Sequence, residues 1–286
     1  MGASGVLREM LLKEGLIIAP GAYDCVTAKL IDQAGFPAVY MTGAGTSASR
    51  LGFPDYGLIT MSEMVANAGA IAAAVRVPVI ADADTGYGNE LNVARTVREF
   101  EKRGVAAIHI EDQVFPKKCG HLEHKEIVPR AEFLSKISAA AGERHDPDFV
   151  IIARTDAIAV AGFDEAIVRA NDALAEGADV AFVEAPQTEE QLRVIPRLVK
   201  GPCLLNIVQG GKSPPVTLKQ AQAFGYRIAI LPTMLLAAVI ETCELVLRAI
   251  TQSGAIPATE HPLTIRELFE RFGADEWDQT QSRYKA

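Results

Sequence analysis

Eight short apolar segments recur along the 286-residue chain, and they restrict its fold more than any other feature. Each is a continuous apolar run, which is typical of a strand buried on both faces of a parallel sheet. Amphipathic segments with helical spacing separate the runs, for example at 22–34, 62–75, 90–103, 131–141 and 164–176. This alternation predicts an α/β fold, a (β/α)8 barrel of the TIM type. The predicted strands are 16–19, 38–42, 78–83, 106–111, 149–154, 180–184, 203–207 and 227–231.

An open, doubly wound sheet is the alternative architecture. It is disfavoured because no strand is followed by the glycine-rich phosphate-binding loop of that fold, and Gly43-Ala44-Gly45 matches it only in part. Gly35, Gly104 and Gly177 follow three predicted helices, where a left-handed cap is needed. We therefore expect one barrel domain over residues 1–286, with no internal domain boundary.

The C-terminal part, residues 233–286, predicts two further helices, at 234–251 and 262–272. The first is so apolar that we expect it to be buried, either under the barrel or against another subunit.

Charge and cysteine content exclude several functions. A net charge of −8 argues against nucleic-acid binding, because no basic field exists to displace counterions. No basic region precedes an apolar signal core, and no apolar stretch is long enough to cross a membrane. The four cysteines are scattered, which is typical of a reducing compartment. These features predict a soluble, cytoplasmic protein.

Acidic residues gather where two neighbouring predicted strands end. Asp82 and Asp84 are two positions apart, so on a regular strand both side chains would point the same way, and Glu111 ends the next strand. Carboxylates are the hard oxygen ligands that Mg²⁺ prefers, with Mn²⁺ as an alternative ion. The competing interpretation is that Asp82 or Asp84 caps the following helix, or that these charges only form ion pairs at the barrel mouth.

The segment 113–129 lacks strand or helix periodicity and predicts a lid over the active site. It contains Lys117, Lys118, Cys119, Gly120 and His121. Cations beside a thiol stabilise its anion, so we expect them to lower the pKa of Cys119. The alternative is a solvated basic loop with an incidental cysteine.

Two more polar residues lie on predicted strands. Arg154 can bind a carboxylate with two hydrogen bonds, although pairing with Glu184 would also explain it. His109 stands between Ile108 and Ile110, so it is either a site residue or an inward-facing barrel residue.

Together these motifs resemble the isocitrate lyase / phosphoenolpyruvate mutase superfamily over nearly the whole chain. The resemblance implies a barrel that binds Mg²⁺ and a 2-oxo or 2-hydroxy acid. It also implies a homotetramer, a dimer of dimers, in which the C-terminal helices are exchanged between subunits. The segments that carry it are 40–43, 51–55, 82–88, 110–113, 117–121 and 152–156.

The resemblance also implies roles for individual residues. Asp84 would bind the metal directly, with Asp82 and Glu111 acting through water. Cys119 would be the acid that protonates the enolate of the departing acid, and Tyr40 and Glu184 are both candidates for the base. The 2-oxo-acid half would contact Thr42, Gly43, Ala44 and Arg154, and the remaining lining would be Tyr40, Asp55, His109, Lys117, Gly120, His121, Glu184 and Asn206.

Residues 206–214 resemble the Asn-Met-Val-Glu-Gly-Gly-Lys-Thr-Pro of 2,3-dimethylmalate lyases and the petal death protein, with Gln209 in place of Glu. We therefore expect a Mg²⁺-dependent carbon–carbon lyase that cleaves a 2-hydroxy dicarboxylate to a 2-oxo acid such as pyruvate and a second carboxylic acid. Alternatives are a methylisocitrate lyase, an oxaloacetate hydrolase or decarboxylase, and a silent 2-oxo-acid sensor. Pro232 argues against the oxaloacetate activity, because oxaloacetate hydrolases have a serine near this position.

Overall fold

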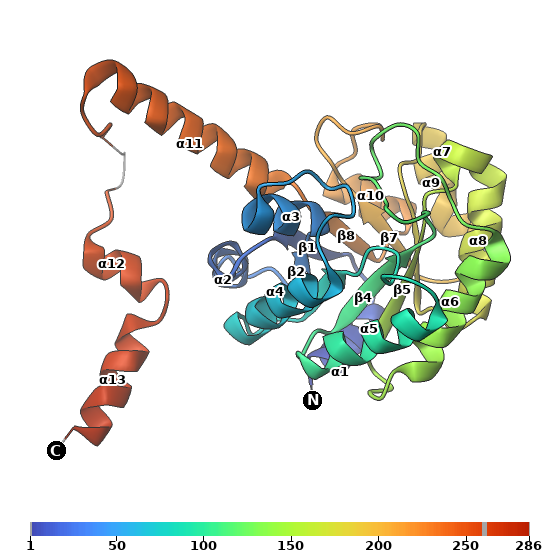
Figure 1. The fold of residues 1–286 in the computed structure, drawn as a ribbon, viewed down its shortest axis with the longest axis horizontal. Coiled ribbons are helices and arrows are strands. Elements are labelled where there is room, and N and C mark those ends of the chain that lie inside the picture. Colours follow the sequence, from blue (N-terminus) through green and yellow to red (C-terminus); the bar gives the residue numbers. More distant parts are fainter. Residues whose placement is uncertain (1, 259–261, 286) are drawn as a thin grey trace. The chain divides into compact units, whose positions relative to one another are not determined.

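The computed structural model describes residues 2–258 and 262–285, and its strands form a closed parallel barrel (Figure 1). The eight strands follow one another in chain order, and β1 pairs with β8, with Ile17 opposite Ile228, to close the barrel. The predicted (β/α)8 barrel is therefore confirmed. Its strands are β1 (Ile17–Ala22), β2 (Val39–Met41), β3 (Val79–Asp82), β4 (Ala107–Glu111), β5 (Val150–Thr155), β6 (Val180–Val183), β7 (Cys203–Asn206) and β8 (Ile228–Leu231).

Helices surround the barrel. Those of the barrel unit are α1 (Ala3–Leu12), α2 (Cys25–Gln33), α3 (Gly43–Leu51), α4 (Met61–Ala74), α5 (Glu90–Lys102), α6 (Arg130–Glu143), α7 (Ile158–Ala161), α8 (Phe163–Ala175), α9 (Glu189–Leu198) and α10 (Leu218–Phe224). The helices predicted at 22–34, 62–75, 90–103, 131–141 and 164–176 are confirmed as α2, α4, α5, α6 and α8. Gly35, Gly104 and Gly177 have positive φ angles as predicted. Among the described residues, no helix combines the length and apolar composition needed to cross a bilayer.

Buried side chains fill the barrel and the layer around it. Ile17, Ile80, Ile152 and Phe182 belong to an interior cluster, and Leu7 of α1 packs against it. A second cluster lies between the strands and helices such as α4, α5 and α6, where Phe100 and Phe133 are fully buried. Because both faces of every strand are covered, the continuous apolar runs are explained.

The chain divides into two compact units, Met1–Leu236 with the barrel and Ala237–Ala286 with the C-terminal helices. Helix α11 (Met234–Ser253) matches its prediction, but α12 (Ile265–Glu270) is shorter than predicted because Thr264 caps its start. A third helix, α13 (Ala274–Tyr284), was not predicted. Residues 259–261 and 286 of the predicted extension lie outside the described residues.

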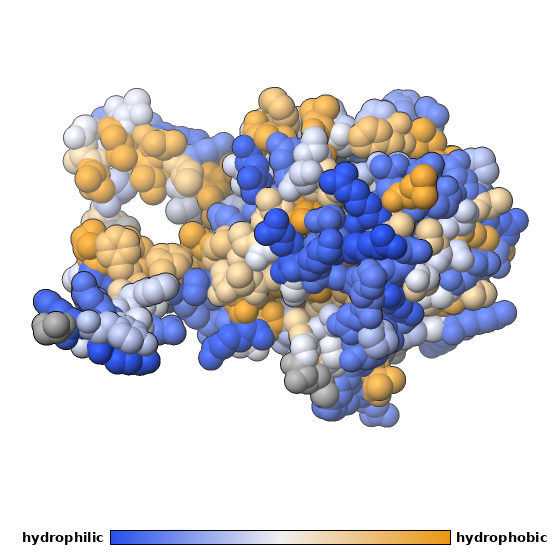
Figure 2. All heavy atoms as spheres, turned by 60° about the horizontal axis from the view of Figure 1, so that its bottom comes forward, coloured by the Kyte–Doolittle hydropathy of each residue, from blue (hydrophilic) through white to orange (hydrophobic). Residues whose placement is uncertain are grey.

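Among the described residues none of those on α11 is buried, although the apolar sequence of this helix predicts burial. Hydrophobic side chains lie on the surface of the C-terminal unit, at the left of Figure 2. On α11 they include Val239, Ile240, Leu245, Leu247 and Ile250, which are 38–63% exposed. Contact with another subunit therefore remains the prediction for this face.

Candidate active site

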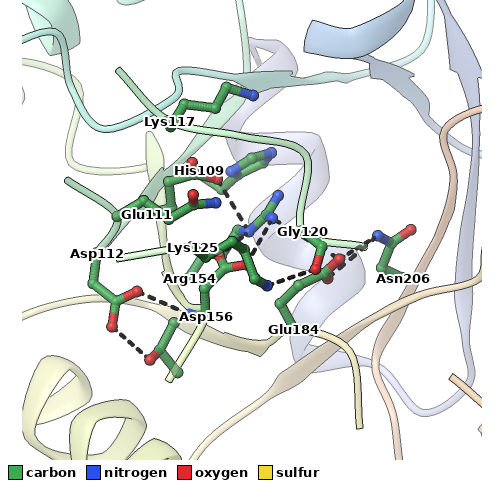
Figure 3. A network of polar contacts seen from close by, with 12 residues as sticks. His109, Glu111, Asp112, Lys117, Gly120, Lys125, Arg154, Asp156, Glu184 and Asn206 are labelled. Atoms are coloured by element: carbon green, nitrogen blue, oxygen red, sulfur yellow. Dashed lines mark hydrogen bonds and ion pairs between the residues drawn. The ribbon is translucent and has the colours of Figure 1, made fainter. Parts of the chain in front are cut away.

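The predicted site residues meet at the carboxyl ends of the barrel strands (Figure 3). Strands β2 to β7 each contribute at least one of them, on the strand or just after it, and all of these side chains are buried. In a TIM barrel this face carries the chemistry. The residues are Tyr40, Asp82, His109, Glu111, Arg154, Glu184 and Asn206.

The acidic residues lie together but not as a regular strand would place them. Asp82 ends β3, whereas Asp84 has φ +47°, so the prediction that both side chains project from one strand face is wrong. Asp82 accepts hydrogen bonds from the N–H groups of Asp84 (2.9 Å) and Gly43 (3.2 Å). The alternative role as helix cap is also wrong, because Asn89 caps α5.

Four buried carboxylate oxygens at this place, both of Asp84 and both of Glu111, accept no well-aligned hydrogen bond from the described residues. Their close contacts are ion pairs, with Lys117 at Asp84 Oδ1 and with Arg154 at Glu111 Oε2. The Glu111 N–H donates to the Asp84 carbonyl (2.8 Å), which holds the two residues side by side. Burial raises the pKa of Asp84 to about 7. Burial also opposes ionisation of Asp82, but His109, Lys117 and Arg154 hold the pKa of Asp82 at about 2.

These oxygens fit a divalent cation. Across residues 2–258 and 262–285, no three His, Cys, Asp or Glu side chains already form a metal-binding group. Mg²⁺ does not need one, because it uses one or two carboxylates and fills its other positions with water and substrate oxygens. Asp84 and Glu111 could supply the two carboxylates, with Asp82 beside them.

The lid, residues 113–129, joins β4 to α6. Its two ends pair through a bridge between Gln113 and Ile127, and the Cys119 N–H donates to the Asp55 carbonyl (3.1 Å). Lys117 is buried, whereas the alternative of a solvated basic loop would leave it exposed. Its Nζ lies 2.6 Å from Asp55 Oδ1 and 2.9 Å from Asp84 Oδ1. The lid is therefore closed onto the acidic residues.

The expectation that nearby cations activate the Cys119 thiol is wrong. Burial raises the pKa of Cys119, and Asp55 and Glu184 raise it further, against the lowering effect of the His121 backbone and Arg154. Lys117 instead faces Asp55 and Asp84, and burial lowers the pKa of His121. A thiol that keeps its proton at neutral pH can act as an acid rather than as a nucleophile.

Arg154 is held mainly by acids other than Glu184. Its Nε lies 2.9 Å from Asp156 Oδ2 and 3.2 Å from Glu111 Oε2, whereas Nη2 is 3.9 Å from Glu184 Oε1. Glu184 accepts from Asn206 Nδ2 (3.1 and 3.3 Å) and lies 3.2 Å from His121 Nε2. The Arg154 guanidinium thus lies near Glu184, but its closest ion pairs are with Asp156 and Glu111.

The N-terminus of α3 completes this face. The Thr42 side chain accepts from the Gly45 N–H, and the Gly43 N–H donates to Asp82. First-turn N–H groups of a helix favour anions. Thr42, Gly43 and Ala44 therefore lie where a carboxylate could bind.

His109 is an inward-facing barrel residue as well as a neighbour of the site. Its side chain is fully buried and stacks on Tyr40, and its Nε2 lies 2.8 Å from the Tyr40 hydroxyl and 3.5 Å from Asp82 Oδ1. Burial lowers the pKa of His109 to about 4.

This pKa predicts a loss of stability in acid. Between pH 6.5 and 4 the unfolded chain binds a proton at His109 and the folded chain does not, so the free energy of unfolding falls with pH by about 3 kcal/mol. Urea unfolding at pH 7 and 4.5 should show a smaller loss in His109→Gln than in the parent. The exposed His145→Gln variant should behave as the parent, and equal losses in all three proteins would contradict the assignment.

Gly120 lies where a side chain cannot fit. An added Cβ would overlap Glu184 Oε1 and Arg154 Nη2, both of which are held by other contacts. We expect Gly120→Ala to fold normally but to lower kcat/KM by at least about tenfold, because the lid would close less well. The matched Gly142→Ala change on α6, where the added Cβ meets nothing within 4 Å, should leave steady-state kinetics unchanged. Parental kinetics in Gly120→Ala would show that this close approach is not needed.

Two buried cations at this face, Lys125 and Arg169, have no sequence signal of their own. Arg169 on α8 looks like a surface ion pair with Glu165 four residues earlier. In the structure it also donates to Asp112 Oδ2 (3.1 Å). Lys125 pairs with Asp156.

Comparison with known proteins agrees with this site. The family model described as phosphoenolpyruvate phosphomutase matches residues 7–251. The 2,3-dimethylmalate lyase of Eubacterium barkeri is 52% identical over 233 residues, covering 82% of this chain and 81% of that protein.

Two solved structures are similar over almost their whole length. Oxaloacetate acetylhydrolase in complex with 3,3-difluorooxalacetate has a TM-score of 0.94 and 39% identity, covering 98% of this chain and 96% of that one. Phosphonopyruvate hydrolase in complex with oxalate and Mg²⁺ has a TM-score of 0.91 and 32% identity, with full coverage of both chains. The chain therefore belongs to the isocitrate lyase / phosphoenolpyruvate mutase superfamily, as its motifs predicted, and is a carbon–carbon lyase of that superfamily.

Proposed function

We propose that the chain is a Mg²⁺-dependent lyase that cleaves a 2-hydroxy dicarboxylate of the 2,3-dimethylmalate type to pyruvate and a second carboxylic acid. The observation that carries this proposal is the place of Cys119, which is half-buried on a lid closed over Arg154, Asp84 and Glu111. Burial raises the pKa of this thiol, which favours its protonated form. The 52% identity to a 2,3-dimethylmalate lyase supports the substrate class.

Substrate would be held through the half that becomes pyruvate. Arg154 and the first turn of α3 supply donors for its carboxylate. Mg²⁺, held by Asp84 and Glu111, would supply positive charge that stabilises the oxyanion as the bond breaks. Mn²⁺ would suit the same oxygen ligands.

Cleavage needs a base for the hydroxyl proton and an acid for the departing carbon. Burial raises the pKa of Tyr40, so this phenol keeps its proton and Glu184 is the better base. As Glu184 takes the C2 hydroxyl proton, the C2–C3 bond breaks and its electron pair moves to C3. Cys119 then donates its thiol proton to C3, and the thiolate regains a proton from solvent when the lid opens.

Oxaloacetate hydrolysis to acetate and oxalate is a second candidate, favoured by the similarity to oxaloacetate acetylhydrolase. Pro232 weighs against it, as stated above. Incubation with 2,3-dimethylmalate, 2-methylisocitrate, isocitrate and oxaloacetate, followed by identification of products, separates these activities. The proposal requires the highest kcat/KM with 2,3-dimethylmalate. Oxalate as the main product, or binding without turnover across the panel, would overturn it.

We also propose that the exposed apolar face of α11 mediates assembly into the homotetramer that the family resemblance implies. Side chains as exposed as Leu247 (63%) and Leu245 (57%) are stabilised when a partner covers them. Light scattering on the full chain tests this assembly, and a monomer at micromolar concentration would contradict it.

A further inference from the structure

The lid contains a second buried lysine, Lys125, that the proposed chemistry does not use. Only 1% of its side chain is exposed, although lysine is rarely buried without partners. Its Nζ donates to Asp156 Oδ1 (2.6 Å) and to the Gly120 carbonyl (2.5 Å). One ammonium group thus joins the lid residue next to Cys119 to the end of β5, as Figure 3 shows.

Asp156 holds the substrate-binding arginine at the same time. Its Oδ2 accepts from Arg154 Nε (2.9 Å), and its Oδ1, which takes Lys125, also accepts from Arg154 Nη2 (3.4 Å). Although burial opposes its ionisation, Arg154 and Lys125 hold the pKa of Asp156 well below its usual range. Asp156 is therefore a shared anion between the lid and Arg154.

Asp156 is itself fixed from behind. Its N–H donates to Asp112 Oδ1 (2.8 Å), and Asp112 Oδ2 accepts from the Thr155 hydroxyl (2.6 Å) and from Arg169 Nη1 (3.1 Å). All four side chains are buried. Because these hydrogen bonds fix the Asp156 carboxylate, it cannot move with the lid. Lid closure must therefore bring Lys125 to Asp156.

We infer that Lys125 is a positioning residue that fixes the closed lid and couples its closure to the orientation of Arg154 through Asp156. This inference rests on the proposed function only in the role given to Cys119. Without the ammonium, the Gly120 carbonyl loses its donor and the lid loses its anchor on β5. The half-buried thiol of Cys119 then becomes more accessible to solvent.

The rate at which iodoacetamide alkylates Cys119, followed by peptide mass spectrometry, measures the solvent accessibility of this thiol directly. We expect Lys125→Met to alkylate at Cys119 at least about tenfold faster than the parent, and protection by Mg²⁺ plus oxalate to be weaker. The control is Lys118→Met in the same lid. Lys118 Nζ donates to the His124 carbonyl within the lid (3.2 Å), and its loss should leave the rate unchanged.

Rates at Cys25 and Cys203 distinguish lid opening from general loosening. A rate at Cys119 within twofold of the parent would overturn the inference, as would equal acceleration at all three cysteines. If Lys125→Met does not fold, Lys125→Gln decides, because its amide is an uncharged donor. An intermediate Cys119 rate supports the inference, and a parental rate overturns it. Alkylation needs no turnover, so a parent protein that cleaves no substrate would refute the proposed function separately.

Discussion

Cys119→Ala is expected to bind substrate and lose cleavage. The variant has no proton donor for the departing carbon, so kcat should fall by at least about 10³-fold, which corresponds to about 4 kcal/mol of activation free energy. Thermal unfolding and calorimetric binding of Mg²⁺ with oxalate should remain close to those of the parent, because Arg154, Asp84 and Glu111 are unchanged.

A matched control is available at the other end of the barrel. Cys203 is buried at the start of β7, so Cys203→Ala makes the same chemical change away from the site. It should keep kcat within about twofold. Turnover by Cys119→Ala near that of the parent would refute the role of this thiol as the acid.

Asp84→Asn is expected to abolish metal-dependent activity. Changing a residue that only supports a metal ligand costs 10- to 100-fold in affinity, so loss of a carboxylate that binds Mg²⁺ directly should cost more than about 100-fold. We expect kcat/KM to fall by at least about 10³-fold. The fold should tolerate the change, because burial already disfavours the charge on Asp84 and raises its pKa to about 7.

Calorimetric titration with Mg²⁺ tests this loss without any need for turnover. EDTA should likewise remove the activity of the parent, and added Mg²⁺ should restore it. Asp172→Asn on the outer helix α8 is the control, and it should bind Mg²⁺ as the parent does. Full activity of the parent in EDTA would contradict a metal role for these carboxylates.

The barrel could be predicted because burial on both faces requires a continuous apolar run in each strand. The eight apolar runs coincide with β1–β8 within a few residues. Helix α3 could not be predicted, since its buried face consists of small residues, Gly43, Gly45, Thr46 and Ser47, which give no apolar periodicity. Helix boundaries in the C-terminal unit depended on caps such as Thr264, which the apolar pattern alone does not reveal.

The residues of the site could be predicted from the ends of the strands, but their ion-pair partners and pKa shifts could not. Lys117 lies two residues from Cys119, yet its ammonium pairs with Asp55, 62 positions away, and with Asp84. The thiol pKa therefore rises through burial instead of falling through adjacent charge. Lys125 is similar, because its partner Asp156 becomes its neighbour only when the lid folds over β5.

Cleavage of 2,3-dimethylmalate in D₂O with Mg²⁺, followed by NMR, tests the central claim most directly. Donation from one fixed thiol predicts equal amounts of pyruvate and propionate, with a single deuterium of one configuration at C2 of the propionate. Propionate deuterated without stereochemical preference, or the absence of pyruvate, would contradict a lyase in which Cys119 protonates the departing carbon.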